Sequence, residues 1–307
     1  MKVTQRIFMV VALFGAMFVT SCSEDKVAPQ AQSIVQIASA DPQFSTLVAA
    51  LTKAELVTTL EGPGPFTVFA PTNTAFAALL TDLGVSSLDA LSKEALTPIL
   101  LNHVIGGQFK STDLSTSYVS TASGSGPDDN FLDLFIEVGT GVSINSSVAV
   151  TSADILASNG VIHVVDKVIL PTDVVDIAAN NSEFTSLVGA LGTAEGDLVS
   201  VLKGDGPFTV FAPVNSAFAD IAGVVAGLDE AQLADVLKYH VVAGANVRST
   251  DLTNGMVVTT LSGTFTVNIS GGTVTLTDES GATVNVIATD IQGTNGVVHV
   301  IDKVLLK

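Results

Sequence analysis

The sequence predicts an α+β fold that occurs twice in tandem. A phenylalanine-rich block, Phe66–Phe76 (FTVFAPTNTAF), recurs as Phe208–Phe218, and a histidine-containing block, Asn159–Leu170 (NGVIHVVDKVIL), recurs as Asn295–Leu306. The offsets of 142 and 136 residues exceed the ~20–50 residues of a solenoid repeat and fit a domain of ~100–150 residues. In each copy, helical periodicity comes first and strand-like alternation later, an order typical of α+β domains.

Each copy begins with apolar residues at helical spacing. Domain one is predicted to span residues 32–171 and domain two residues 172–307. The segments with helical spacing are Ile34–Ala38 and Phe44–Val48 in domain one, matched by Val174–Ala178 and Phe184–Val188 in domain two. A short apolar strand follows, which Pro71 or Pro213 ends. Next come Asn73 and Asn215, which have the residue type and position of helix caps.

The best-defined helix carries a histidine on its apolar stripe. The residues at i, i+3, i+4, i+7 and i+8 are Leu96, Ile99, Leu100, His103 and Val104, matched by Leu233, Val236, Leu237, His240 and Val241. Glycines at 106, 107 and 244 are expected to end these helices. Strand signals follow, and the segment from Val257 to Val286 predicts an antiparallel meander, because short alternating runs are broken by glycines.

Three motifs, in the same order in both copies, resemble the fasciclin family. They are T-V-F-A-P-x-N-x-A-F at 67–76 and 209–218, a Tyr-His pair at 239–240 that becomes Asn102-His103 in domain one, and N-G-V-[IV]-H-V-[VI]-D-K-V at 159–168 and 295–304. The resemblance covers about Gln32 to Lys307. It implies a helical layer packed on a β-wedge of mostly antiparallel short strands. It also implies a non-catalytic role in adhesion or matrix contact, outside the cell or on its envelope.

The same resemblance marks candidate partner contacts. In animal members of the family, an Asp-Ile pair just before the last motif is proposed to contact receptors. The matching positions are Asp154-Ile155 and Asp290-Ile291. Tyr239 and His240 join them as candidates, because the Tyr-His motif is intact only in domain two.

Residues 1–21 are expected to be a lipoprotein signal peptide. Lys2 and Arg6 precede an apolar run, and the run ends in Val19-Thr20-Ser21-Cys22, which resembles a bacterial lipobox. Cys22, the only cysteine, would then carry the lipid, and residues 22–31 would form a tether; a plain secreted protein is the alternative. The expected location is the cell envelope, as an outer-membrane lipoprotein, and the acidic residues after Ser23 favour an outward-facing orientation.

Charge and composition exclude some classes of partner. With 12 basic and 30 acidic residues, the formal net charge is −18, which argues against nucleic acid and against an anionic membrane surface. The sequence contains no P-loop, G-x-S-x-G, C-x-x-C or H-E-x-x-H motif. We therefore expect neither an enzyme nor a cofactor.

The four histidines leave two interpretations open. His103, His163, His240 and His299 are either structural or part of a small-ligand or metal-ion site. A zinc site generally needs three or four protein ligands. Asp166 and Asp302 lie three residues beyond the strand histidines, where strand geometry points them to the opposite face. Asp128, Asp129 and Asn130 fit either a calcium ligand set or a solvated turn.

The leading hypothesis is an envelope-anchored adhesion protein whose partner is extracellular matrix, a glycan or a cell-surface protein. The alternative is a binding module that uses the buried histidines. The Ser/Thr/Gly-rich segment Ser111–Asn130 has a shorter counterpart in domain two. It is either a specificity loop or a low-complexity spacer. The number of binding domains and the oligomeric state stay open.

Overall fold

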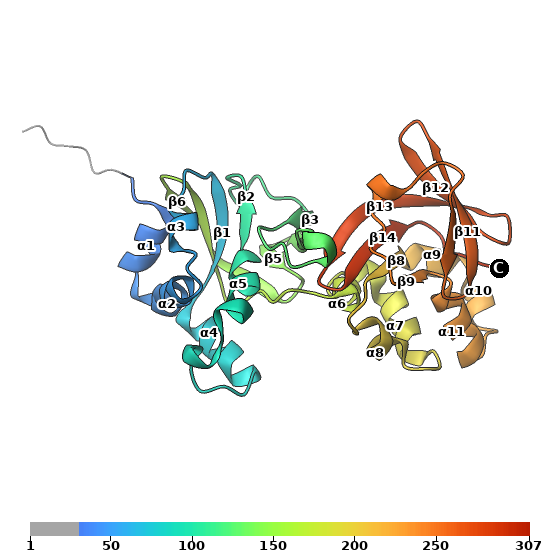
Figure 1. Cartoon of the computed structure of the whole chain (residues 1–307), viewed down its shortest axis with the longest axis horizontal. Coiled ribbons are helices and arrows are strands. Elements are labelled where there is room, and N and C mark those ends of the chain that lie inside the picture. The colour runs from blue at the N-terminus through green and yellow to red at the C-terminus, as the bar shows by residue number, and fades with distance from the viewer. Residues whose placement is uncertain (1–30) are drawn as a thin grey trace, which may run out of the picture. The chain divides into compact units, whose positions relative to one another are not determined.

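The computed structural model describes residues 31–307 (Figure 1). The predicted signal peptide, most of the tether and the lipidation site Cys22 lie outside these residues. Within residues 31–307, no helix is both long enough and apolar enough to cross a bilayer.

Domain one contains five α-helices and seven strands. The helices are α1 (Ile34–Ala40), α2 (Ser45–Lys53), α3 (Val57–Leu60), α4 (Asn73–Asp82) and α5 (Lys93–Leu101). The strands are β1 (Phe66–Pro71), β2 (Val104–Gly106), β3 (Ser117–Ser120), β4 (Asp133–Val138), β5 (Val142–Ile144), β6 (Val148–Ala157) and β7 (Gly160–Val165).

Domain two repeats this order with one more short helix. Its helices are α6 (Val174–Ala179), α7 (Thr185–Thr193), α8 (Leu198–Leu202), α9 (Asn215–Asp220), α10 (Ala222–Val225) and α11 (Glu230–Lys238). Its strands are β8 (Phe208–Pro213), β9 (Val241–Ala243), β10 (Val257–Thr260), β11 (Gly263–Ser270), β12 (Thr273–Thr277), β13 (Thr283–Gly293) and β14 (Gly296–Ile301).

The strands of each domain form one seven-stranded mixed sheet. The orders are β2-β1-β7-β6-β5-β4-β3 and β10-β11-β12-β13-β14-β8-β9. All pairs are antiparallel except β1 with β7 and β8 with β14, which are parallel. The predicted α+β fold is confirmed, and so is the antiparallel meander, which is β10 to β13.

Strands β7 and β14 each begin with a glycine, because the backbones of the parallel pair approach closely there. A Cβ at Gly160 would lie 2.0 Å from the carbonyl oxygen of Phe66, and one at Gly296 would lie 2.2 Å from that of Phe208. No side chain fits such a gap. The glycine of the N-G-V motif therefore serves the fold.

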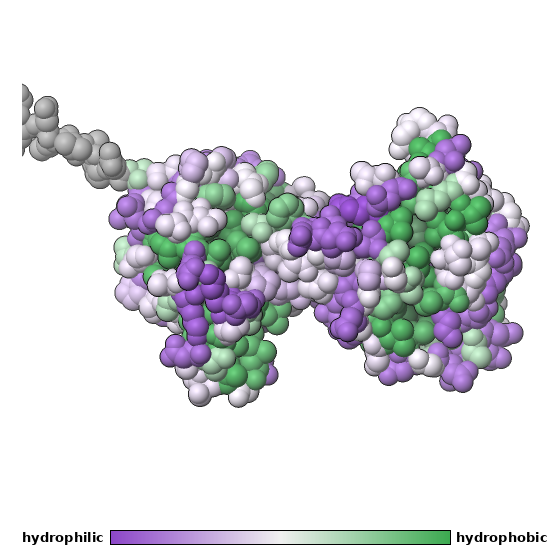
Figure 2. Space-filling model, viewed as in Figure 1, coloured by the Kyte–Doolittle hydropathy of each residue, from purple (hydrophilic) through white to green (hydrophobic). Residues whose placement is uncertain are grey.

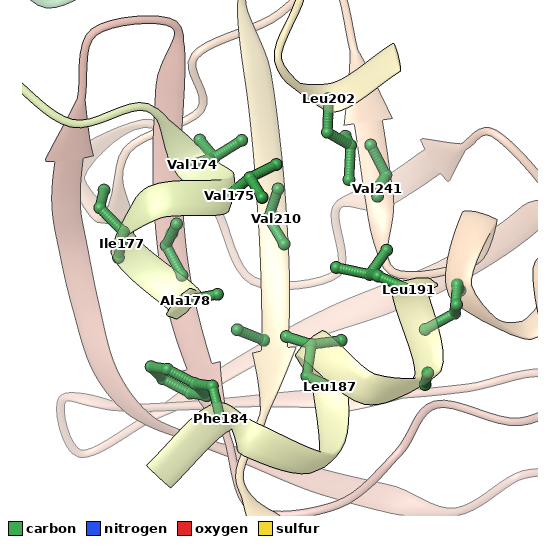
Figure 3. Packing of buried hydrophobic residues seen from close by; sticks show 14 of the residues in the cluster. Val174, Val175, Ile177, Ala178, Phe184, Leu187, Leu191, Leu202, Val210 and Val241 are labelled. Atoms are coloured by element: carbon green, nitrogen blue, oxygen red, sulfur yellow. The ribbon is translucent and has the colours of Figure 1, made fainter. Parts of the chain in front are cut away.

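Each domain has two apolar clusters. One lies between the helices and the sheet, where α6 and α7 cover β8 in domain two (Figure 3). The other lies inside the curved sheet, around Phe69 in domain one and Phe211 in domain two. Both phenylalanines are at most 1% exposed, and burying a side chain of this size stabilises a fold by about 1.5–3 kcal/mol.

The histidine helix is shorter than its periodicity predicts. It ends at Leu101 in domain one and at Lys238 in domain two, and Val104 and Val241 already belong to strands. The ring of the histidine explains this end, because its Nδ1–H donates to the carbonyl oxygen four residues earlier. That carbonyl would otherwise accept the next backbone N–H of the helix.

The expected capping role of Asn73 and Asn215 was wrong. Each residue begins its helix, and the cap of α4 is Thr72, whose hydroxyl accepts from the Ala75 N–H. The Asn73 side chain instead accepts from the Thr46 N–H at 2.9 Å, as Asn215 does from the Ser186 N–H. The asparagines therefore join two helices, a tertiary contact that local sequence does not reveal.

Candidate functional site: the Asp-Ile bulges

The two Asp-Ile pairs lie at equivalent irregularities of the sheet. β6 shifts its register against β7 between Ser152 and Ile155, and β13 shifts against β14 between Ala288 and Ile291. At the shift, Asp154 has φ 65° and Asp290 φ 64°, the left-handed region that aspartate tolerates better than most residues.

Each aspartate of the bulge holds the loop that follows the second strand of its domain. Asp154 accepts from the backbone N–H of Ser111 at 2.7 Å and from its hydroxyl at 2.6 Å. These two hydrogen bonds hold the pKa of the Asp154 carboxyl below its usual value. Asp290 receives the same pair of bonds from Ser249.

The strand histidines complete this clamp. His163 Nδ1 accepts from the Asp154 N–H at 3.3 Å, and its Nε2–H donates to the carbonyl of Phe109 at 2.9 Å. His299 makes the same contacts to Asp290 and Val247, at 3.3 and 2.8 Å. Aspartate, histidine and serine thus fix the bulge and the loop as one unit, which supports the structural interpretation of His163 and His299.

The side chains around the bulges differ greatly in exposure. Ile291 is 2% exposed and belongs to the core of domain two, and Ile155 is half-buried against the core of domain one. The residue after Ile155, Leu156, is 56% exposed, and Phe109 on the clamped loop is 37% exposed. A contact through the isoleucines stays a prediction, which burial disfavours most for Ile291.

Sequence reasoning missed Leu156 and Phe109 as surface residues beside the bulge. Apolar surface is common on this chain, as Figure 2 shows on both domains, and scattered apolar residues are normal. What distinguishes these two is their place on a clamped bulge and loop. The available signal was the difference between copies, because Gln292 and Val247 stand at the matching positions.

His103 and His240, the two histidines that follow a helix, are buried, and both ring nitrogens of each form hydrogen bonds. His103 is 2% exposed; its Nδ1–H donates to the Ile99 carbonyl at 2.7 Å, and its Nε2 accepts from the Ile169 N–H at 2.8 Å. His240 bonds Val236 and Leu305 in the same way. Burial lowers the pKa of each to about 4. Both ring nitrogens are therefore occupied at neutral pH.

This occupancy weakens the ligand and metal alternative. An apolar cavity of about 20 Å³ lies beside each of these two histidines, which is room for about one water molecule. Within residues 31–307, no three His, Cys, Asp or Glu side chains gather as a metal site would need. Asp166 and Asp302 accept backbone N–H groups of Ala149 and Asn285 instead of approaching the histidines.

Tyr239 is also a core residue. It is completely buried, its hydroxyl donates to the Thr264 carbonyl at 2.6 Å, and the same oxygen accepts from the Glu279 N–H at 3.1 Å. In domain one, the shorter Asn102 leaves its Oδ1 without a partner among the described residues. A partner contact through Tyr239 or His240 stays a prediction for side chains that lie below the surface.

The turn at Asp128, Asp129 and Asn130 is built by its own backbone and side chains. Both aspartates have φ 58°. The Asn130 amide donates to the Pro127 carbonyl, and its Oδ1 accepts from Arg248 at 2.9 Å. This arrangement favours the turn over a calcium ligand set, because the Asn130 oxygen already has a donor.

Comparison with known proteins identifies the family. The sequence pattern of the fasciclin domain matches residues 42–171 and 182–307. Protein sll1483 of Synechocystis sp. is 44% identical over 142 residues, which cover 46% of this chain and 74% of that protein. Human periostin is 31% identical over 254 residues, 80% of this chain but only 29% of periostin.

A solved structure shares the arrangement of the fold. The fasciclin domain pair of the insect cell adhesion molecule fasciclin I matches 86% of this chain and 97% of its own, with a TM-score of 0.51 and 18% identity. At that identity, the likeness concerns the fold alone. Together with the pattern found in both halves, it shows that this chain belongs to the fasciclin family, as two fasciclin domains in tandem.

Proposed function

We propose that this chain is an adhesion protein of a bacterial cell envelope, anchored by lipid on Cys22 and acting by surface contact without turnover. Membership of the fasciclin family supports a role in adhesion, since one solved relative is named as a cell adhesion molecule. The partner is extracellular matrix, a glycan or a protein on another cell.

The observation that carries the proposal is the clamped bulge of domain one. It presents Leu156 and Phe109, 56% and 37% exposed, on backbone that Asp154, Ser111 and His163 hold in place. Apolar side chains on a rigid support lose little freedom when they bind, so more of the contact energy appears as affinity. We call this surface the domain-one bulge face: Phe109, Lys110 and Leu156.

Anchoring would add to the affinity. More than one acyl chain keeps a protein stably on a membrane, and many copies on one surface bind a multivalent partner with avidity beyond that of a single contact. A single weak face per chain is therefore sufficient for adhesion.

A retention assay tests the proposal. Beads coated with the chain from Gln32 to Lys307 are mixed with bacterial cells, extracellular matrix and cell-wall glycans, and an inert protein of similar negative charge is the control. We expect retention on one of these surfaces above the control, and no loss of retention when a chelator is added. Equal retention by both proteins on all three surfaces would refute adhesion.

A further inference from the structure

The connection between β3 and β4 of domain one is much longer than its counterpart in domain two. Ser120 on β3 pairs with Asp133 on β4, and Thr260 on β10 pairs with Gly263 on β11. The residues between the paired strands are Thr121–Leu132 in domain one but only Leu261-Ser262 in domain two. The ends of the two connections make the same bonds, since the Ala122 N–H donates to the Val104 carbonyl as the Leu261 N–H does to that of Val241. The extra residues of domain one are therefore Gly124–Phe131, and the sheet of domain two forms without them.

Asp133, at the end of this segment, binds domain two. It is 8% exposed, and one carboxylate oxygen accepts from the Gln292 backbone N–H at 2.7 Å while the other accepts from the Ser120 hydroxyl at 2.6 Å. Strands β4 and β13 are in contact there. A buried carboxylate is costly unless it is hydrogen-bonded, so these two bonds give the contact a defined geometry.

Residues of the longer connection also contact domain two beside Gln292. Asn130 accepts from Arg248 Nη1 at 2.9 Å, and Arg248 also donates to the side-chain oxygen of Gln292 at 3.3 Å. The Gln292 side chain is completely buried and donates to the carbonyls of Gly293 and Gly296. A Cβ added at Gly126 would lie only 3.0 Å from Gln292 Cγ.

A second contact lies one strand away. Tyr118 on β3 packs against the core of domain two, and its hydroxyl accepts from the Asn181 amide at 3.0 Å. Burial raises the pKa of this phenol to about 12. Tyr118 and Asp133 thus bring two points of the β3–β4 hairpin against domain two, which resists both sliding and rotation.

In domain one, the surface equivalent to the one around Gln292 is not contacted by a comparable segment within residues 31–307. Leu156 stands where domain two has Gln292, and Lys110 where it has Arg248. Leu156 pairs with Val161 in the same register as Gln292 with Val297, so its N–H points to the same outer edge of the sheet. Domain two lacks the long segment that would reach such an edge.

We propose that Thr121–Leu132 with Asp133 is an intramolecular docking segment whose partner is the bulge of domain two, and that it locks the two domains in one relative orientation. The segment that distinguishes the copies is then used inside the chain rather than for an outside partner. This holds whether or not the chain mediates adhesion.

Distances between two spin labels test the lock. Cys22 is the only cysteine, so a mature chain with Cys22→Ser accepts labels at Leu83→Cys in domain one and Val257→Cys in domain two, both exposed positions. We expect one narrow distance distribution for this chain. Asp133→Ala and Arg248→Ala should each broaden it severalfold, because they remove the contact from opposite sides. Asp128→Asn, on the same segment but outside the contact, is the matched control, and its distance distribution should stay narrow.

Circular dichroism and urea unfolding show whether each variant domain is still folded. Because Asp133 and Arg248 belong to different domains, broadening in both variants cannot come from local damage to one domain. A broad distribution in the unaltered chain, or distributions that stay narrow in both variants, would overturn the proposal.

Discussion

His103 and His240 each join the end of a helix to the last segment of their domain, through Ile169 and Leu305. Both nitrogens are used only when the ring is neutral, because Nε2 must accept a hydrogen bond. Protonation would therefore break one bond and leave a charge in the apolar core. Burial, which disfavours the charged ring, is the cause of the lowered pKa.

The first prediction concerns acid stability. The folded pKa of about 4 lies below the ordinary value of 6.5, so between these values the unfolded chain binds more protons than the folded chain. Each neutral histidine therefore contributes about 3 kcal/mol to the free energy of unfolding. This contribution is fully present above pH 6.5 and is lost as the pH falls toward 4. Urea unfolding of domain two at several pH values should show this slope.

His240→Gln provides the comparison for this slope. The variant should be less stable at pH 7, because it loses the bond to Leu305, but its stability should depend less on pH between 6.5 and 4. An unchanged slope in the variant would show that other groups cause the acid sensitivity.

The second prediction concerns the bulge clamp. Asp154→Ala removes both bonds to Ser111 and places alanine at φ 65°. We expect a loss of about 2–4 kcal/mol of unfolding free energy in domain one, from the bonds and the strained backbone together. Asp154→Asn keeps an acceptor oxygen and tolerates this φ, so it should cost clearly less. Urea unfolding measures both variants. Equal losses of unfolding free energy in Asp154→Ala and Asp154→Asn would contradict a stabilising role of the clamp geometry.

At the scale of elements, Tyr239 shows how the two sheets differ. Tyr239 follows α11, and a Cβ at Gly263 of β11 would lie 2.8 Å from a Glu279 carboxylate oxygen and 3.1 Å from the Tyr239 ring, so the ring packs closely over this glycine. In domain one, Asn102 stands at the position of Tyr239, and Leu132, whose carbonyl accepts from the Thr121 N–H, stands at that of Gly263. The shorter asparagine of domain one is thus accompanied by a larger residue, the buried Leu132, where domain two has a glycine.

The third prediction follows from this pairing. Tyr239→Phe loses the bond to the Thr264 carbonyl and should lower the stability of domain two by about 1–2 kcal/mol. Tyr239→Asn, which copies domain one, also leaves a cavity and should cost about 3–5 kcal/mol. Thermal unfolding measures both, and a variant with asparagine as stable as the one with phenylalanine would contradict the packing argument.

The sequence predicted elements better than their ends and contacts. The duplicated motifs were sufficient to predict the α+β fold and the tandem organisation, since they recur at domain spacing. Periodicity did not predict the early end of α5, because the His103 ring replaces a backbone donor there. The role of Asn73 depends on Thr46, which is distant in sequence. The exposure of Leu156 depends on the bulge, which periodicity does not reveal.

At the scale of the whole molecule, the fourth prediction concerns the anchor. If Cys22 carries lipid, the protein should fractionate with membranes, and Cys22→Ser should release it or leave its precursor unprocessed. The described domains should keep their fold in the variant, because Cys22 lies before them. A membrane-bound Cys22→Ser protein of mature size would contradict the anchor.

The two domains contribute unequally to surface contact in this account. The bulge of domain two contacts Asp133 and Asn130, whereas the domain-one bulge face exposes Leu156 and Phe109. We therefore predict one contact face per chain, on domain one.

The retention assay with a pair of variants tests this claim most directly. Leu156→Ser removes the most exposed apolar side chain of the bulge face, and Leu83→Ser removes one of similar exposure, 48%, at the end of α4. We predict that Leu156→Ser lowers retention at least tenfold, which corresponds to about 1.4 kcal/mol, while Leu83→Ser matches the unaltered chain. Retention that is unchanged by Leu156→Ser, or lowered equally by both substitutions in folded protein, would contradict the account.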